Sequence, residues 1–257
     1  MATELLSSTS AEPWSEAAEP TTWAGAAAIP RLLASPAQAE AAAAQLVPRL
    51  AAQAAETDVV GAFPTQEFNW LRAAGLLTAA LPAALGGAGL QATAATLPLL
   101  RVLQSMGQGN LAVGRVYEGH LNALMLIQQL GTSGQVARYA ADARAGLLFG
   151  VWNTENPADG VHLEALPNGR YRLRGAKTFA SGAGYLARPL ISGALPEERL
   201  AAICAASRCP AAGAGPLLLA ALGDAGHGQL PSRFDRAGDW AGGPHRPAQC
   251  LLPAAHV

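Results

Sequence analysis

The sequence is short of charge, of aromatic residues and of cysteine, and it contains no long apolar run. Charged residues make up 14% of the chain and the net charge is −1, so the sequence offers no basic surface for a nucleic acid. The three cysteines, Cys204, Cys209 and Cys250, lack the spacing of metal ligands or of a disulfide framework and are expected to be reduced thiols. No apolar stretch approaches the ~20 residues of a membrane helix, and the N-terminal segment lacks the pattern of a signal peptide. We therefore expect a cytoplasmic protein whose partners are small molecules or other subunits, with no nucleic acid, metal or membrane span.

Alanine-rich segments with helical periodicity fill the first half of the chain. Ser35 and Thr132 each stand three residues before a glutamine, which is the pattern of an N-terminal capping box. Gly75 follows an apolar segment at a position typical of a helix end, and Pro48 and Pro98 are expected to kink or split two helices. The predicted helices cover about 35–58, 65–74, 92–106, 110–130 and 132–146.

Short strand-like runs replace the helical periodicity at Leu147. Asn168-Gly169, a pair that favours the tight turn of a β-hairpin, separates two of these runs. The predicted strands cover about 147–154, 161–166, 171–173, 177–181, 187–193 and 199–204. Strands after a block of helices predict an α+β fold, here an N-terminal α-helical bundle-like domain followed by a small antiparallel β-domain. The expected divisions are a disordered or loosely docked arm (1–33), the helical domain (34–146), the β-domain (147–208) and an irregular tail (209–257).

Two strand-like runs end in the same combination of residues. Trp152 is followed by the hydroxyl of Thr154, and Phe179 is followed by the hydroxyl of Ser181. Strand ends of this kind can present backbone amides, a hydroxyl and a flat apolar wall to a planar polar ring. The alternative is a purely structural role, in which Thr154 and Ser181 are ordinary sheet residues and both aromatic rings lie in the core. The candidate binding residues are Trp152, Asn153, Thr154, Phe179, Ala180 and Ser181.

Two other features of the sequence could be taken for functional sites. The glycine-rich segment 82–90 lacks the Lys-Ser/Thr ending of a phosphate-binding loop and does not follow a strand, so a tight connection between helices is the better interpretation. Glu118 and His120 could handle protons together, but residues two apart do not share a helix face, so they are expected to be unrelated.

Several segments in a fixed order resemble the acyl-CoA dehydrogenase family of flavoproteins. The resemblance spans roughly 36–205, about two-thirds of the chain. In the strand-rich part, Trp152-Asn153-Thr154-Glu155 looks like the family's first flavin motif. The segment 175–183 looks like its second, with Phe179 where family members often have tryptophan. The helical segments that carry the resemblance are 63–64, 71–76, 82–90 and 114–132.

The resemblance implies a three-part fold with FAD between the β-domain and a C-terminal helical domain, commonly at a subunit interface. It also implies FAD-linked oxidoreduction of a CH–CH group, with α,β-dehydrogenation of an acyl thioester, a homo-oligomer and an electron-acceptor protein as a partner. Backbone groups from Trp152 to Thr154 and the Thr154 hydroxyl would bind the polar edge of the flavin. Phe179 would cover a ring face, with Ser181 close by.

The sequence departs from the family at two places. After the first motif it has Asp159-Gly160-Val161 in place of the family's Gly-Ser-Asp, which helps to position the CoA ester. The C-terminal helical domain, which usually supplies the carboxylate base, has no counterpart in the tail, so we expect a truncated chain and assign no catalytic residue. An interrupted reading frame after about Cys209 would account for such a tail.

These departures leave two alternatives to an acyl-CoA dehydrogenase. One is a flavin-dependent monooxygenase relative on the same fold, and the other is a non-catalytic assembly or binding subunit. Without the C-terminal helical domain, an inactive truncated chain is one of the outcomes that the sequence leaves open.

Overall fold

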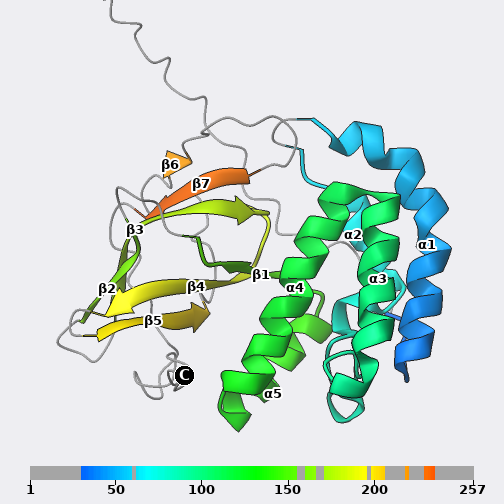
Figure 1. Cartoon of the computed structure of the whole chain (residues 1–257), viewed down its shortest axis with the longest axis horizontal. Helices are drawn as coiled ribbons and strands as arrows, with labels where there is room; N and C mark the ends of the chain where they lie inside the picture. The colour runs from blue at the N-terminus through cyan, green and yellow to red at the C-terminus, as the bar shows by residue number, and fades with distance from the viewer. Residues whose placement is uncertain are drawn as a thin grey trace, which may run out of the picture.

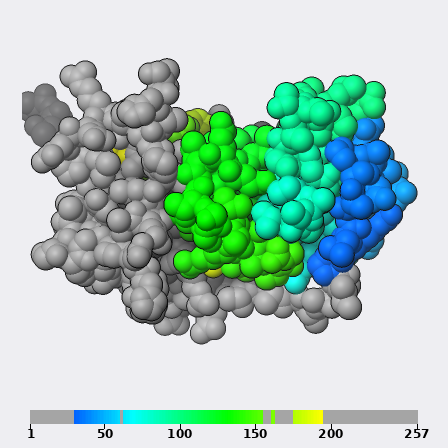
Figure 2. Space-filling view, turned by 90° about the horizontal axis from the view of Figure 1, so that it is seen from below, coloured from blue at the N-terminus to red at the C-terminus, as the bar shows by residue number. Residues whose placement is uncertain are grey.

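A layer of helices packs against one edge of a twisted sheet in the computed structural model (Figure 1). The structure describes residues 30–59, 62–154, 160–165, 171–195, 198–205, 218–219 and 229–234. Helix α1 contacts α3, α3 contacts α4, and α4 contacts strand β1, so α4 connects the helical region to the sheet. On the surface in Figure 2 the helical region passes from α1 (blue) through α3 to α4 and α5 (green). No helix within the described residues is both long and apolar enough to cross a bilayer.

The five predicted helices are present. Ser35 and Thr132 are N-caps, and Thr132 and Gln135 form the reciprocal capping box. Pro48 does not divide its helix, and Pro98 lies in the first turn of α3, where a missing N–H costs no hydrogen bond, so it does not interrupt the helix. The helices are α1 (Pro36–Thr57), α2 (Thr65–Ala73), α3 (Thr96–Gly109), α4 (Leu111–Leu130) and α5 (Ser133–Arg144), with 3₁₀ turns η1 (Leu76–Thr78), η2 (Ala83–Leu85) and η3 (Thr93–Ala95).

Within the described residues the sheet has seven strands in the order β1-β4-β2-β3-β7-β6, with β5 pairing with β4. β2 and β3 form the predicted antiparallel hairpin, whose Asn168-Gly169 turn lies outside the described residues. The strands are β1 (Phe149–Trp152), β2 (His162–Ala165), β3 (Tyr171–Ser181), β4 (Arg188–Leu195), β5 (Glu198–Ala205), β6 (Leu218–Leu219) and β7 (Gln229–Phe234).

The α+β class is confirmed, but two details of the prediction need correction. The sheet is mixed, because β1 pairs in parallel with β4, and so does β2 at one position. The segment 209–257, expected to be irregular, contributes β6 and β7, and β7 pairs with the long strand β3. The alternation in Gln229–Phe234 is weak and includes Pro231, so this strand forms because β3 offers a partner, which no local pattern reveals.

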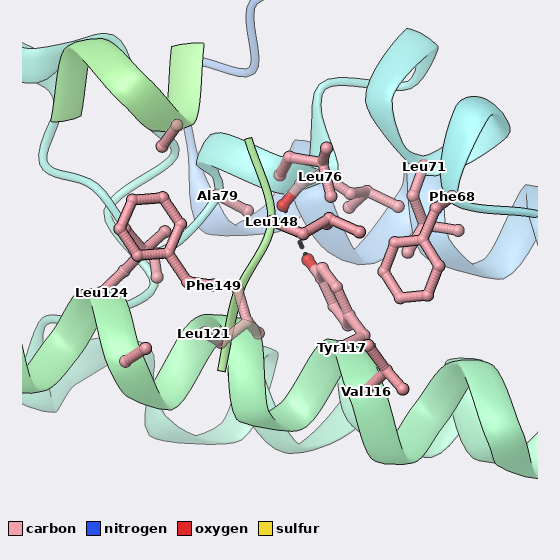
Figure 3. Close-up of a cluster of buried hydrophobic side chains, with 14 of the residues drawn as sticks. Phe68, Leu71, Leu76, Ala79, Val116, Tyr117, Leu121, Leu124, Leu148 and Phe149 are labelled. Carbon is pink, nitrogen blue, oxygen red and sulfur yellow. Dashed lines mark hydrogen bonds between the residues drawn. The ribbon is translucent and has the colours of Figure 1, made fainter. Parts of the chain in front are cut away.

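Helix α4 carries the apolar side chains that join the two regions. Figure 3 shows Tyr117 and Leu121 of α4 packed with Leu76 from η1 and with Leu148 and Phe149 at the start of β1. All five side chains are buried. Burying each leucine or phenylalanine contributes about 1.5–3 kcal/mol, so this contact is a large share of the energy that docks the sheet on the helices.

Two polar groups of α4 lie inside this core and are hydrogen-bonded there. The Tyr117 hydroxyl donates to the Leu76 carbonyl oxygen at 2.8 Å (Figure 3). His120 is fully buried, with Nε2 2.7 Å from the Leu77 carbonyl oxygen and Nδ1 3.1 Å from the Phe149 amide nitrogen. Since the Phe149 N–H must donate to Nδ1, Nε2 carries the single proton and the ring is neutral. His120 therefore links η1, α4 and β1 through one imidazole.

Burial lowers the pKa of His120 to about 4, against a smaller opposing effect of the hydrogen bond to the Leu77 carbonyl. Burial also raises the pKa of the Tyr117 hydroxyl. A second proton on His120 would place an N–H on Nδ1, facing the Phe149 N–H. The folded state therefore resists protonation of this ring.

The free energy of unfolding should fall in acid because of His120. The unfolded histidine titrates near its ordinary pKa of about 6.5, so its contribution is complete above that pH and is lost as the pH falls toward about 4. The slope from this one group approaches about 1.4 kcal/mol per pH unit. Urea unfolding of the parent and of His120→Gln across this range measures it as the difference between the two curves. Gln129→Ala, an exposed change on the same helix, serves as the control. A pH-independent difference between parent and His120→Gln would contradict this account.

Candidate functional site

The ends of β1 and β3 lie side by side. The Trp152 indole Nε1–H donates to the Ser181 carbonyl oxygen at 3.2 Å, and the Thr178 amide donates to the Thr154 carbonyl oxygen at 3.0 Å. A side-chain bond between residues 29 apart in sequence and a backbone bond thus join the two aromatic-plus-hydroxyl motifs. The structure brings Thr154 and Ser181 to one region of the sheet, as the binding hypothesis requires.

A third connection runs through two buried side chains. The Lys177 Nζ donates to the Ser192 hydroxyl at 2.9 Å, and the Ser192 hydroxyl donates to the Asn153 carbonyl oxygen at 3.4 Å. Lys177 has no exposed surface, and Ser192 is also buried. Trp152, Asn153 and Thr154 are therefore each tied to β3, the middle one through β4. The sequence analysis did not single out Lys177 or Ser192, because no local pattern predicts a buried lysine in a strand.

A β-bulge in β3 brings Phe179 to the surface. Lys177 pairs with Ser232 and Ala180 pairs with Leu230, so two residues of β3 lie opposite Pro231 alone. Proline has no N–H to donate to the neighbouring strand. The Thr178 N–H, for its part, donates to the Thr154 carbonyl oxygen and not to β7.

The bulge gives Phe179 an unusual conformation. It has a φ of 56°, the sole positive φ at a non-glycine residue in the part of the chain that the structure describes. Its ring is 59% exposed. A left-handed phenylalanine costs about 1–2 kcal/mol, and an exposed ring recovers little of that by burial. Strain of this kind points to a role outside folding.

Ser181 carries an unsatisfied polar atom next to the bulge. The residue is only 7% exposed, and its Oγ has no hydrogen-bond partner among the described residues. A buried hydroxyl without a partner costs about 1–3 kcal/mol, so a ligand that bonds to it would recover energy. Asn153 and Thr154 are exposed beside it, and Ala180 is buried in the strand between Phe179 and Ser181.

The aromatic wall is formed differently from the expectation. Trp152 is 1% exposed, so its ring belongs to the core and its indole N–H holds the motifs together. Of the two motif aromatics, only Phe179 can face a ligand. The alternative that both rings lie in the core therefore holds for Trp152 and not for Phe179. Glu155, the last residue of the first motif, lies outside the described residues.

The segment 82–90 is a closed turn. The Gly87 N–H donates to the Pro82 carbonyl oxygen and the Gly89 N–H to the Leu81 carbonyl oxygen, so these amides are not available to a phosphate. A Cβ on Gly87 would lie 2.1 Å from the Leu81 oxygen, which explains the need for glycine.

Glu118 and His120 are separate, as expected from their spacing. Glu118 pairs with Arg115 at 2.6 Å on the outer face of α4, while His120 is buried. The part of the chain that the structure describes contains no cluster of three metal-binding side chains.

Comparison with known proteins agrees with this fold. Residues 37–146 match the family model described as acyl-CoA dehydrogenase, N-terminal domain. The comparison with curated proteins finds no match.

Several solved structures share the architecture. Methanesulfinate monooxygenase MsuC from Pseudomonas fluorescens is 22% identical, with a TM-score of 0.61 over 83% of this chain and 52% of that chain. The ChsE4–ChsE5 complex from Mycobacterium tuberculosis is 21% identical, with a TM-score of 0.61 over 84% and 57%. FMN-bound TdsC from Paenibacillus sp. A11-2 is 20% identical, with a TM-score of 0.57 over 65% and 43%. The chain spans about half the length of these proteins, and identities at this level establish the fold alone.

Replacing the strained residue should stabilise the protein. Phe179→Gly relieves the left-handed conformation and exposes no core, so we expect the free energy of unfolding to rise by about 1 kcal/mol. Thr178→Gly, one residue earlier and without a positive φ, should lower it by about the same amount. Chemical denaturation measures both. A Phe179→Gly protein less stable than the parent would show that the ring contributes to folding after all.

Proposed function

We propose that the chain is part of a flavin-dependent oxidoreductase, because residues 37–146 match the model of the acyl-CoA dehydrogenase N-terminal domain and the described fold agrees with that match. The observation that supports the proposal most is the pairing of an exposed, strained Phe179 with an unsatisfied Ser181 hydroxyl at the joined ends of β1 and β3. A planar ring with a polar edge satisfies both features at once.

The residues present fit an isoalloxazine. Phe179 would cover one ring face, and the Ser181 hydroxyl would donate to or accept from the polar edge. Thr154 is exposed beside them, and its hydroxyl and backbone N–H would complete that edge. A bound flavin supplies a ring that takes up and returns electrons. The protein's part is to orient the ring and to place donors where its charge develops.

The first candidate reaction is FAD-linked dehydrogenation of an acyl thioester, which the family model favours. No described side chain is assigned as its base. FAD is preferred to FMN on the family resemblance, whereas the TdsC structure contains FMN.

The second candidate is flavin-dependent monooxygenation. Asp159-Gly160-Val161 stands where the family's CoA-positioning Gly-Ser-Asp is expected. Proteins named as monooxygenases, MsuC and the dibenzothiophene enzyme TdsC, have the same fold. The same strand ends would serve either reaction, because both require an oriented flavin.

The proposal includes assembly with further protein. The chain covers 57% of the similar chain in the ChsE4–ChsE5 complex, a complex of two named components. We propose that this chain likewise functions in an oligomer, with an electron-acceptor protein as a further partner of the dehydrogenase candidate. The third candidate is a non-catalytic assembly or binding subunit. It would assemble without binding flavin, which separates it from the dehydrogenase and the monooxygenase.

Flavin binding is tested directly by titrating the purified chain with FMN and, separately, with FAD. We expect saturable quenching of flavin fluorescence. Phe179→Ala should weaken binding about 5-fold, because a stacked aromatic pair contributes about 1 kcal/mol. Ser181→Ala should weaken it to a similar extent through the lost hydrogen bond. Leu100→Ala, an exposed apolar change on α3, is the control and should have no effect. Linear, unsaturable quenching by both flavins would contradict the proposal.

The reaction class is tested on the flavin-loaded protein. The dehydrogenase candidate predicts bleaching of the flavin absorbance when an acyl-CoA is added without oxygen. The monooxygenase candidate predicts no bleaching by acyl-CoA, but oxygen uptake when the flavin is supplied reduced together with an oxidisable aromatic or sulfur compound.

A further inference from the structure

Lys177 is the one lysine of the protein and is fully buried. It lies in β3, directly before the bulge. Placing a lysine nitrogen in a core is costly, and a methionine would fill similar space without that cost. The Lys177 Nζ donates to the Ser192 hydroxyl, and this is not the residue's only interaction. The question is what the bond to Ser192 accomplishes.

The chain from Lys177 to Asn153 has a fixed direction. A protonated lysine nitrogen has donors and no acceptor, so the Ser192 oxygen accepts from it. The Ser192 proton is then directed to the Asn153 carbonyl oxygen. Successive hydrogen bonds of this kind polarise one another, and a peptide whose carbonyl accepts a bond has a more strongly donating N–H at its other end.

The N–H at the other end belongs to Thr154. Thr154 is exposed, and its amide makes no hydrogen bond within the residues that the structure describes, although its carbonyl accepts from Thr178. The Asn153 and Thr154 carbonyl oxygens, on either side of this N–H, both accept hydrogen bonds, whereas the Thr154 N–H itself is left for a ligand.

We infer that Lys177 is a positioning residue that acts through Ser192 to orient and polarise the Asn153–Thr154 peptide, so that the Thr154 N–H is a preorganised donor to an anionic or electron-rich ring edge. The inference rests on the proposed flavin site for the identity of that ring. Lys177 never touches the ligand. It lies behind the peptide that does.

The relay is tested first without any flavin. The amide proton resonance of Thr154 reports on the polarisation of its peptide, and isotope-labelled full-length chain provides it by NMR. Lys177→Met and Ser192→Ala should each shift this resonance upfield, and the double variant should shift it no further than either single change, because both break one chain. Ser105→Ala is the matched control. It removes a hydroxyl hydrogen bond to the Arg101 carbonyl oxygen within α3 and should leave the Thr154 resonance unchanged.

The second readout is affinity for FMN by fluorescence titration. Lys177→Met and Ser192→Ala should each raise the dissociation constant about 10-fold, as expected for weakening one charge-assisted donor. Ser192→Thr retains the hydroxyl and should restore most of the affinity. Circular dichroism and thermal melts establish that each variant is folded, and Ser192→Ala compared with Ser192→Thr keeps the test open if Lys177→Met does not fold.

The outcomes separate the two proposals. A Thr154 resonance that stays in place in folded Ser192→Ala and Lys177→Met proteins overturns the relay, whatever happens with flavin. Failure of the parent chain to bind FMN or FAD, with Thr154 shifting as described, overturns the flavin proposal and leaves the relay standing. A shift at Thr154 together with the parallel loss of FMN affinity supports both.

Discussion

Three hydrogen bonds join Trp152, Asn153 and Thr154, at and just after the end of β1, to the neighbouring strands β3 and β4, and the geometry of the candidate site depends on them. Trp152, Asn153 and Thr154 are consecutive, and each is fixed by a different kind of bond: indole to carbonyl, hydroxyl to carbonyl, amide to carbonyl. A bond of each kind contributes about 1 kcal/mol, which is small against the stability of a domain. Their importance is geometric. They place an exposed aromatic ring and an unsatisfied hydroxyl of β3 beside the exposed residues Asn153 and Thr154, which follow β1.

The helical region fixes the other end of β1. His120 accepts from Phe149 at the first residue of the strand while donating to η1, and Tyr117 donates to η1 one residue away. The Asp142–Arg188 ion pair, at 2.8 Å, joins α5 to β4, the strand that lies parallel to β1. β1 is only four residues long. Held by α4 at its start and by β3 at its end, it transmits the position of the helices to the site.

Local sequence chemistry predicted the elements well, and long-range pairing escaped it. Ser35 and Thr132 marked helix starts because a capping side chain bonds to residues three positions away. The candidate residues at the ends of β1 and β3 could be named because hydroxyl and aromatic types stand at strand ends in the sequence. The bulge could not be predicted, since it depends on Pro231, some fifty residues beyond Phe179. Nor could the burial of Trp152 and Lys177, because both depend on which strand lies beside which.

The central claim is that two strand ends form one binding surface for a flavin ring. The most direct measurement is an NMR titration of labelled chain with FMN that follows the amide resonances of Thr154 and Ser181. The account predicts that both move, together with Phe179, along one saturation curve, while resonances on the outer face of α3 stay fixed. Movement at one strand end alone, or shifts spread evenly over the protein, would contradict it.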